Sequence, residues 1–152
     1  KNGTVDKVAV VLALQNIEEM NETLAECVRV LSPKGKLYLV LNHPAFRIPK
    51  ASSWSYDEKT KVQYRRVDRY LSSFKTEIEM HPGSNKEKTV SFHHPLQTYF
   101  KALHKQGLVV SRLEEWNSMK KSQKGPRAEA EDRARAEFPL FMALEAQKLP
   151  NR

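Results

Sequence analysis

The chain has 152 residues, of which 39% are hydrophobic and 29% charged, a composition that favours one globular domain over disorder. No apolar run approaches the roughly 20 residues that span a bilayer. The single cysteine, Cys27, excludes an internal disulfide and agrees with a cytoplasmic protein. The net charge of +8 allows an anionic partner, although an acidic segment elsewhere in the protein could balance it.

The first two predicted elements are a strand and a helix. Residues 8–14 (VAVVLAL) form a continuous apolar run, which predicts a strand buried on both faces of a parallel sheet. Asn16 precedes Glu19 by three residues, the spacing of a capping box, so Asn16 is the expected N-cap of a helix. The expected buried stripe of this helix consists of Ile17, Met20, Leu24, Cys27, Val28 and Leu31.

A turn and a second strand follow this helix. Pro33 and Gly35 are expected to end the helix and to form the turn. Residues 37–41 (LYLVL) then predict a second buried strand. Together these elements predict a βαβ unit with parallel strands and a right-handed crossover.

The region 45–92 breaks this pattern with polar, aromatic and basic residues. Residues 74–80 (FKTEIEM) alternate apolar and polar side chains, as do residues around 89–92. Between them, residues 81–85 are rich in turn formers. We therefore expect an inserted antiparallel hairpin that acts as a lid and does not join the main sheet.

A further helix is predicted after this insertion. Pro95 suits the first position of the helix, and Gly107 is expected to end it. Its expected buried stripe consists of Leu96, Tyr99, Phe100 and Leu103.

Two more strands complete the predicted α/β fold. Residues 108–116 (LVVSRLEEW) predict a third core strand, and residues 138–146 (FPLFMALEA) a final strand, although their composition also permits a helix. Between them lie a lysine-rich connection, 117–126, and a short solvated helix, 127–136.

Three segments carry a family resemblance: residues 6–46, which include RVLSPKGKLYLVL, residues 92–116, and residues 137–148. Together they resemble the C-terminal half of class I S-adenosylmethionine-dependent methyltransferases. The resemblance implies half of a Rossmann-like doubly wound sheet: a βαβ unit, a hairpin lid, a helix and strand, and a terminal antiparallel strand. Residues 1–152 would then form one partial domain, with 45–92 as its acceptor-side lid. S-adenosyl-L-methionine would be the cofactor and a small molecule the methyl acceptor.

The glycine-rich cofactor loop and the ribose-binding acidic residue of that family have no candidate in this sequence. The five glycines, Gly3, Gly35, Gly83, Gly107 and Gly125, show no G-x-G spacing. Such a loop lets backbone amides approach the cofactor, so this chain alone is expected to be inactive. Because the first methionine is Met20, inside a predicted helix, we expect the sequence to belong to a longer protein.

Ligands of doubly wound sheets lie beyond the carboxyl ends of the parallel strands. The candidate ligand-binding residues are therefore those that follow the two predicted parallel strands. By the resemblance, Leu14, Gln15 and Asn16 would contact the methionine end of the cofactor. Asn42 and His43 would face the acceptor. Asn16 has its capping role as an alternative, and Gln15 could instead face solvent.

His43 is the one candidate for a catalytic base. Imidazole titrates near neutrality and could accept a proton from the acceptor. However, alignment supplies much of the rate of a displacement, so a base is optional. The alternative is that His43 fixes the turn before Pro44.

Tyr56, Tyr64 and His94 are the remaining acceptor-site candidates. Aromatic rings suit a planar acceptor and can hold a sulfonium by cation–π attraction. Alternatively, the aromatic residues of 45–92 form a small core of the lid itself. His93 and His94 lack a third ligand in register, so no metal site is expected.

Two hypotheses about partners remain open. The mixture of arginines and aromatic residues in 45–92 would also suit an RNA-binding or RNA-modifying module, which is the alternative function. Half of a doubly wound sheet would expose a strand edge and an apolar face, so we expect the chain to self-associate as a dimer.

Overall fold

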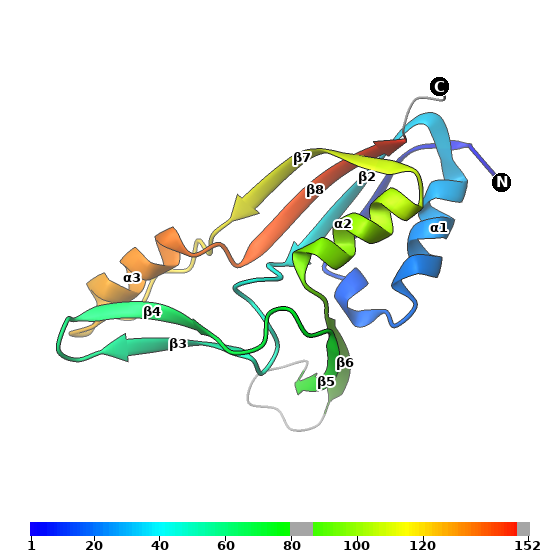
Figure 1. Cartoon of the computed structure of the whole chain (residues 1–152). Helices are drawn as coiled ribbons and strands as arrows, with labels where there is room; N and C mark the ends of the chain where they lie inside the picture. The colour runs from blue at the N-terminus through cyan, green and yellow to red at the C-terminus, as the bar shows by residue number, and fades with distance from the viewer. Residues whose placement is uncertain (80–86, 149–152) are drawn as a thin grey trace.

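The computed structural model describes residues 1–79 and 87–148 of the chain (Figure 1). Its elements are β1 (Val5–Val11), the 3-10 helix η1 (Leu14–Asn16), α1 (Met20–Val30), β2 (Leu31–Asn42), β3 (Ser52–Asp57), β4 (Val62–Val67), β5 (Phe74–Glu79), β6 (Lys88–His93), α2 (Leu96–Lys105), β7 (Leu108–Trp116), α3 (Ala128–Glu137) and β8 (Phe141–Lys148). The predicted α/β class is confirmed. Within the described ranges, no helix is both long and apolar enough to cross a membrane. The predicted turn at 81–85 lies outside these ranges.

The main sheet has four strands in the order β1-β2-β8-β7. β1 and β2 run parallel, with Val8 opposite Leu37 and Val11 opposite Val40. β8 lies between β2 and β7 and is antiparallel to both. The predicted βαβ unit and terminal antiparallel strand are therefore confirmed, although β8 begins at Phe141 instead of Phe138.

The hydrophobic core lies between one face of this sheet and the helices α1 and α2 (Figure 1). β2 is its centre, because Leu37, Leu39 and Leu41 are fully buried while the residues between them are half-buried. Leu24 of α1 and Leu103 of α2 are buried in the same cluster. The alternate residues of β2 face away from both helices, since side chains of a strand point to opposite faces in turn.

Two strands that were expected in the interior lie at the edges of the sheet. β1 was predicted to be buried on both faces, but the side chain of Val11 is 59% exposed. β7 likewise exposes Leu113 and Trp116. Each strand has a neighbour on one side only, and the helices cover one face, so alternate apolar side chains reach solvent.

The predicted capping of the first helix by Asn16 is wrong. Asn16 is exposed at the end of η1, and the N-cap position of α1 is Glu19, which forms no side-chain capping bond. The reason is the burial of Leu14 and Gln15 in the short 3-10 turn, after which Ile17 is extended and α1 starts three residues further on.

The predicted turn at Pro33 and Gly35 appears as an irregularity inside β2. The pairing with β1 jumps from Val5–Leu31 to Lys7–Lys36, so the residues between bulge out of the ladder. Gly35 is buried there, and a Cβ atom on it would lie 2.8 Å from the side chain of Leu31.

The second helix differs from its prediction by about one residue. Pro95 occupies the N-cap position of α2, one residue before the predicted place. Phe100 is exposed, and Ala102 takes its place in the buried stripe. Ala102 follows Tyr99 by three residues and so shares its helix face, whereas Phe100 lies a quarter turn away. Gly107 ends the element with a φ of +72°, as predicted.

The inserted region contains two antiparallel hairpins. β5 pairs with β6, which confirms the predicted hairpin, and β3 pairs with β4, which the sequence analysis missed. Both form separate two-stranded sheets outside the main sheet. β6 contacts η1, whereas β4 contacts α3, so the hairpins cover different parts of the molecule (Figure 1).

Candidate functional site

The carboxyl ends of β1 and β2 lie side by side and form a rim at one end of the sheet. The ladder continues past β1, where the Leu12 N–H donates to the Val40 carbonyl over 2.8 Å. η1 follows immediately and contacts β2. Gln15 and Asn42 therefore emerge at the same edge of the sheet, as the parallel pairing predicted.

The backbone at this rim is strained. Leu12, directly after β1, has a φ of +50°. A residue with a side chain pays about 1–3 kcal/mol for such a conformation, and strained positions cluster at functional sites. The strain turns the chain sharply from β1 into η1, and thereby places Gln15 and Asn16 at the end of the sheet.

Gln15 is a buried polar residue of the rim. Its side chain is 8% exposed, and in the described part of the chain its Oε1 atom has no hydrogen-bond partner. Leaving a buried acceptor unsatisfied costs about 1–3 kcal/mol. An acceptor kept at such a cost beside a strained turn can bind an N–H donor of a ligand.

The other two cofactor candidates differ from Gln15 in exposure. The side chain of Leu14 packs in the hydrophobic core, so only its backbone can reach a ligand. Asn16 is exposed, and since it does not cap α1, its amide is available to a ligand.

The hairpin β5–β6 covers the rim on the side of η1. β6 contacts η1 directly, and the Nζ atom of Lys75 lies 3.7 Å from the carboxylate of Glu18. The β5–β6 hairpin thus lies beside the rim, and its action as a lid stays a prediction.

His43 is buried at the end of β2, and both of its ring nitrogens have partners. Nδ1 accepts the Ala45 N–H over 3.1 Å, so the ring proton lies on Nε2, which donates to Glu115 Oε1 over 2.8 Å. The ring also packs on Phe46, with 4.9 Å between centroids. Neither nitrogen is free to take a proton in this arrangement, which favours the alternative that His43 fixes the turn before Pro44.

The remaining acceptor candidates do not come together. Tyr56 and Tyr64 lie on opposite faces of the β3–β4 hairpin, since Tyr64 pairs with Ser55 and not with Tyr56. Tyr64 lines a cavity between β4 and α3. His94 lies apart from both, with Nδ1 3.1 Å from the Ser73 hydroxyl. Asn42 is half-buried among the residues of β2 that face away from α1 and α2.

Part of the aromatic group forms a small core, the alternative considered from the sequence. Phe138 packs edge-on against Phe46 and Trp54, with centroid distances of 5.6 Å and 5.7 Å. The guanidinium of Arg65 lies 5.0 Å from the Trp54 ring and donates to the Phe46 carbonyl. These contacts join the β3–β4 hairpin to the segment before β8, away from η1.

The base of the β5–β6 hairpin is anchored by residues that the sequence pattern did not single out. The Tyr70 hydroxyl accepts the Leu96 N–H over 3.2 Å and so caps α2. His93 Nε2 donates to the Tyr70 carbonyl over 2.8 Å, and the His93 ring packs on Phe74 at 5.1 Å. Period-two alternation along β6 would have placed His93 outward, because the apolar Val90 lies on the opposite face and is exposed, whereas Ser91 and His93 are buried.

Stability should depend on pH through the two histidines at the base of the β5–β6 hairpin. Burial lowers the pKa of His93 and of His94, and the nearby Arg69 lowers that of His93 further. Below about pH 6.5 the unfolded chain then binds more protons than the folded one, so the free energy of unfolding should fall as pH drops through this range. Urea denaturation at a series of pH values measures this. His94→Gln should flatten the dependence, and an equal slope in wild type and variant would contradict it.

No metal site is indicated in the part of the chain that the structure describes, where no three His, Cys, Asp or Glu side chains are grouped to hold an ion.

The parallel β1–β2 pair, its helical crossover and the antiparallel β8 form part of a Rossmann-like sheet, a fold that this chain shares with solved S-adenosylmethionine-dependent methyltransferases. Residues 1–39 match the family model described as a methyltransferase domain. No curated protein matches the chain. The resemblance inferred from the sequence is confirmed at the level of the fold by solved structures.

Three solved structures illustrate this likeness. An S-adenosylmethionine-dependent methyltransferase from Mesorhizobium loti is 20% identical, with a TM-score of 0.72 over 97% of this chain and 63% of that one. A Listeria monocytogenes protein assigned to the same class is also 20% identical, with a TM-score of 0.74 over 98% and 63%. A glycopeptide N-methyltransferase in complex with S-adenosyl-L-homocysteine is 15% identical, with a TM-score of 0.55 over 96% and 55%. The chain thus spans less than two thirds of the length of each.

Proposed function

We propose that this chain forms the acceptor-side part of an S-adenosylmethionine-dependent methyltransferase that acts on a small molecule in the cytoplasm. The observation that carries the proposal is the rim where β1 and β2 end together, with the unsatisfied Gln15 Oε1 beneath the β5–β6 hairpin. The glycopeptide N-methyltransferase of the same fold has structures with S-adenosyl-L-homocysteine, sinefungin and S-adenosyl-L-methionine, which supports this choice of cofactor.

The residues at the rim fit the methionine end of that cofactor. An ammonium group is a donor only, and the buried Gln15 Oε1 is an acceptor only, so the two are complementary. The Leu14 backbone and the Asn16 amide offer further polar groups beside it. S-adenosyl-L-methionine would supply an electrophilic methyl group on a sulfonium.

The chain's own contribution to the reaction is alignment. Gln15 and Asn16 orient the donor side, and the β5–β6 hairpin covers it from water. His43, through Ala45 and Glu115, holds the turn that places Asn42 at the acceptor side. Positioning of this kind can supply about 7–11 kcal/mol of a displacement barrier, so the proposed mechanism needs no protein base.

The rest of the methyltransferase domain is expected to come from sequence outside this chain. This chain spans 63% of the Mesorhizobium structure, and its sequence has no G-x-G spacing with which a glycine-rich loop could approach the cofactor. We therefore propose that residues 1–152 alone are inactive. The predicted dimerisation stays a prediction; it would use the open edge of β1 and its exposed Val11.

Calorimetry with S-adenosyl-L-homocysteine tests the proposal. The protein that includes the remaining part of the domain should bind with a dissociation constant in the micromolar range, whereas residues 1–152 alone should bind far more weakly. In the longer protein, NMR shift changes should centre on Gln15 and Asn16. An absence of binding heat in the longer protein would refute the assignment.

A further inference from the structure

A basic surface lies at the end of the molecule where the β3–β4 hairpin meets α3. It consists of the tip of that hairpin, residues 57–61, and the connection between β7 and α3, residues 117–127. Together these segments carry six basic and two acidic side chains, a net charge of +4, which is half of the charge of the whole chain. The connection contributes four of the basic side chains and no acidic one.

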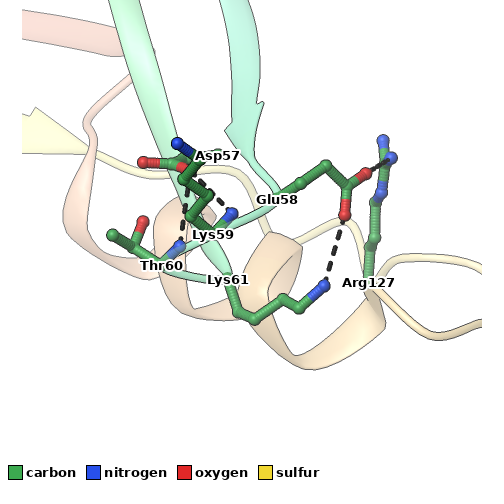
Figure 2. Close-up of polar contacts among 6 residues, drawn as sticks. All are labelled: Asp57, Glu58, Lys59, Thr60, Lys61 and Arg127. Atoms are coloured by element: carbon green, nitrogen blue, oxygen red, sulfur yellow. Dashed lines mark hydrogen bonds and ion pairs between the residues drawn. The ribbon is translucent and has the colours of Figure 1, made fainter.

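The two segments of the basic surface are joined by Arg127. Figure 2 shows its guanidinium pointing at the carboxylate of Glu58, with which it forms an ion pair. The same guanidinium lies 4.5 Å from the ring of Tyr56. Lys61 approaches the other oxygen of Glu58, with 3.3 Å between Nζ and Oε2 (Figure 2). Two cations thus share one carboxylate, and the contact leaves positive charge in excess.

The second acidic residue of the tip is engaged within its own turn. Asp57 Oδ1 accepts the backbone N–H groups of Lys59 and Thr60, over 2.8 Å and 3.3 Å (Figure 2). These bonds lower the pKa of the Asp57 carboxyl, so it stays ionised and holds the turn. Its carboxylate therefore serves the local backbone and pairs with no lysine of the connection.

The lysines of the connection form no ion pair with a described residue, although Lys121 lies near enough to Asp132 to help lower the pKa of that carboxyl. Lys120, Lys121 and Lys124 are exposed, and none of them takes part in the ion pairs found in residues 1–79 and 87–148. All three line a cavity of about 440 Å³ between the connection and α3. The acidic residue of that lining, Glu131, lies 3.6 Å from Arg135.

The connection keeps a defined shape despite its polarity. The Ser122 N–H donates to Asp132 Oδ1 over 2.8 Å, and its hydroxyl donates to the Ala128 carbonyl over 3.0 Å. Arg135 donates to the Lys120 carbonyl. The lysines are therefore held on a folded loop, which lowers the entropy lost when they bind a ligand.

Exposed aromatic rings lie on the two strands that adjoin the basic surface. Trp116, the last residue of β7, is 43% exposed and donates its Nε1–H to Glu114, and Tyr64, on the face of the β3–β4 hairpin opposite to Tyr56, is 46% exposed. Lysines spread along a loop can contact successive phosphates of a strand, and exposed aromatic rings on the adjoining strands can stack with its bases. From these observations we infer that the basic surface binds the phosphate backbone of a single-stranded nucleic acid.

An anionic membrane is the competing partner, and the composition of the loop disfavours it. Insertion into a lipid interface, which strengthens binding beyond charge attraction, requires an apolar face beside the cations. Within residues 117–127, all of which the structure describes, Met119 is the one large hydrophobic side chain that is exposed. The inferred binding does not rest on methyl transfer, and it can be tested on residues 1–152 whether or not these bind cofactor.

Fluorescence anisotropy with a labelled single-stranded RNA of about 20 nucleotides tests the inference at several salt concentrations. Wild type should bind with an affinity that falls steeply as salt rises. The variant Lys120→Ala/Lys121→Ala/Lys124→Ala should lower the salt slope by about 2, since each phosphate contact on a single strand contributes about 0.7. Its affinity at low salt should fall by roughly tenfold or more.

The matched control removes the same charge elsewhere. Lys34→Ala/Lys101→Ala/Lys105→Ala substitutes three exposed lysines at the start of β2 and on α2, and should leave slope and affinity near wild type. Circular dichroism verifies that both variants fold. An equal loss in the control would show attraction by net charge alone and overturn the inference. Stronger binding to vesicles of phosphatidylserine than to RNA, lost in the first variant, would overturn it as well.

Discussion

Replacing Leu39 by alanine is expected to lower the free energy of unfolding by about 3–4 kcal/mol. Leu39 is fully buried on β2, with Val10 opposite it on β1 and Leu144 on β8. The substitution removes apolar contacts and leaves a cavity that a strand held by ladders on both sides cannot close. Because small domains are stable by about 5–15 kcal/mol, the loss is a large share of the total.

Urea denaturation followed by circular dichroism measures this loss, with Leu113→Ala as the matched control. Leu113 is also a strand leucine, but it is exposed on the edge strand β7, so its truncation should cost less than about 1 kcal/mol. Equal losses in the two variants would mean that β2 is not the centre of the core.

The central part of the fold could be predicted because its sequence signals are local and agree with one another. The run at 37–41 is apolar throughout, and a helix-length segment separates it from the run at 8–14, which together require a parallel crossover. β7 was predicted with its observed bounds, since Gly107 comes before its apolar start and a lysine-rich segment follows Trp116. Hydrophobic pattern identifies a strand of this kind whatever its neighbours are.

The exposure of strands could not be predicted in the same way, because it depends on what lies beside them. Val11 belongs to an apolar run that would suit an interior strand, yet β1 has a partner on one side only. β3 and β4 were missed because their alternation is between aromatic and polar residues, such as Trp54 and Ser55, and carries a weak hydrophobic signal. Their place is set by contacts with Phe138 and α3, far away in sequence.

The location of the candidate site followed from strand direction, whereas the roles of its side chains did not. Asn16 and Glu19 have capping-box spacing, but burial of Leu14 and Gln15 decides where the helix begins. The partner of His43 Nε2 is Glu115, on a strand 72 residues further along the chain. A non-local hydrogen bond of this kind leaves no trace in local sequence pattern.

Replacing Gln15 by methionine is expected to change stability and ligand binding in opposite directions. Methionine has a similar length and flexibility but no polar oxygen, so the variant removes the unsatisfied acceptor from the buried site. The free energy of unfolding should rise by about 1 kcal/mol. In the protein that carries the whole domain, affinity for S-adenosyl-L-homocysteine should fall by at least about tenfold, since the ligand's ammonium loses its acceptor.

The control Gln97→Met lies on the exposed surface of α2 and should change neither quantity beyond about 0.5 kcal/mol. A stabilised Gln15→Met variant with unchanged affinity would mean that the unsatisfied oxygen is a packing defect, and the cofactor would have to bind elsewhere on the rim. A destabilised variant would mean that Gln15 supports the strained turn at Leu12. Only a gain in stability together with a loss of binding is expected from a polar group that the fold keeps, at a cost, for a ligand.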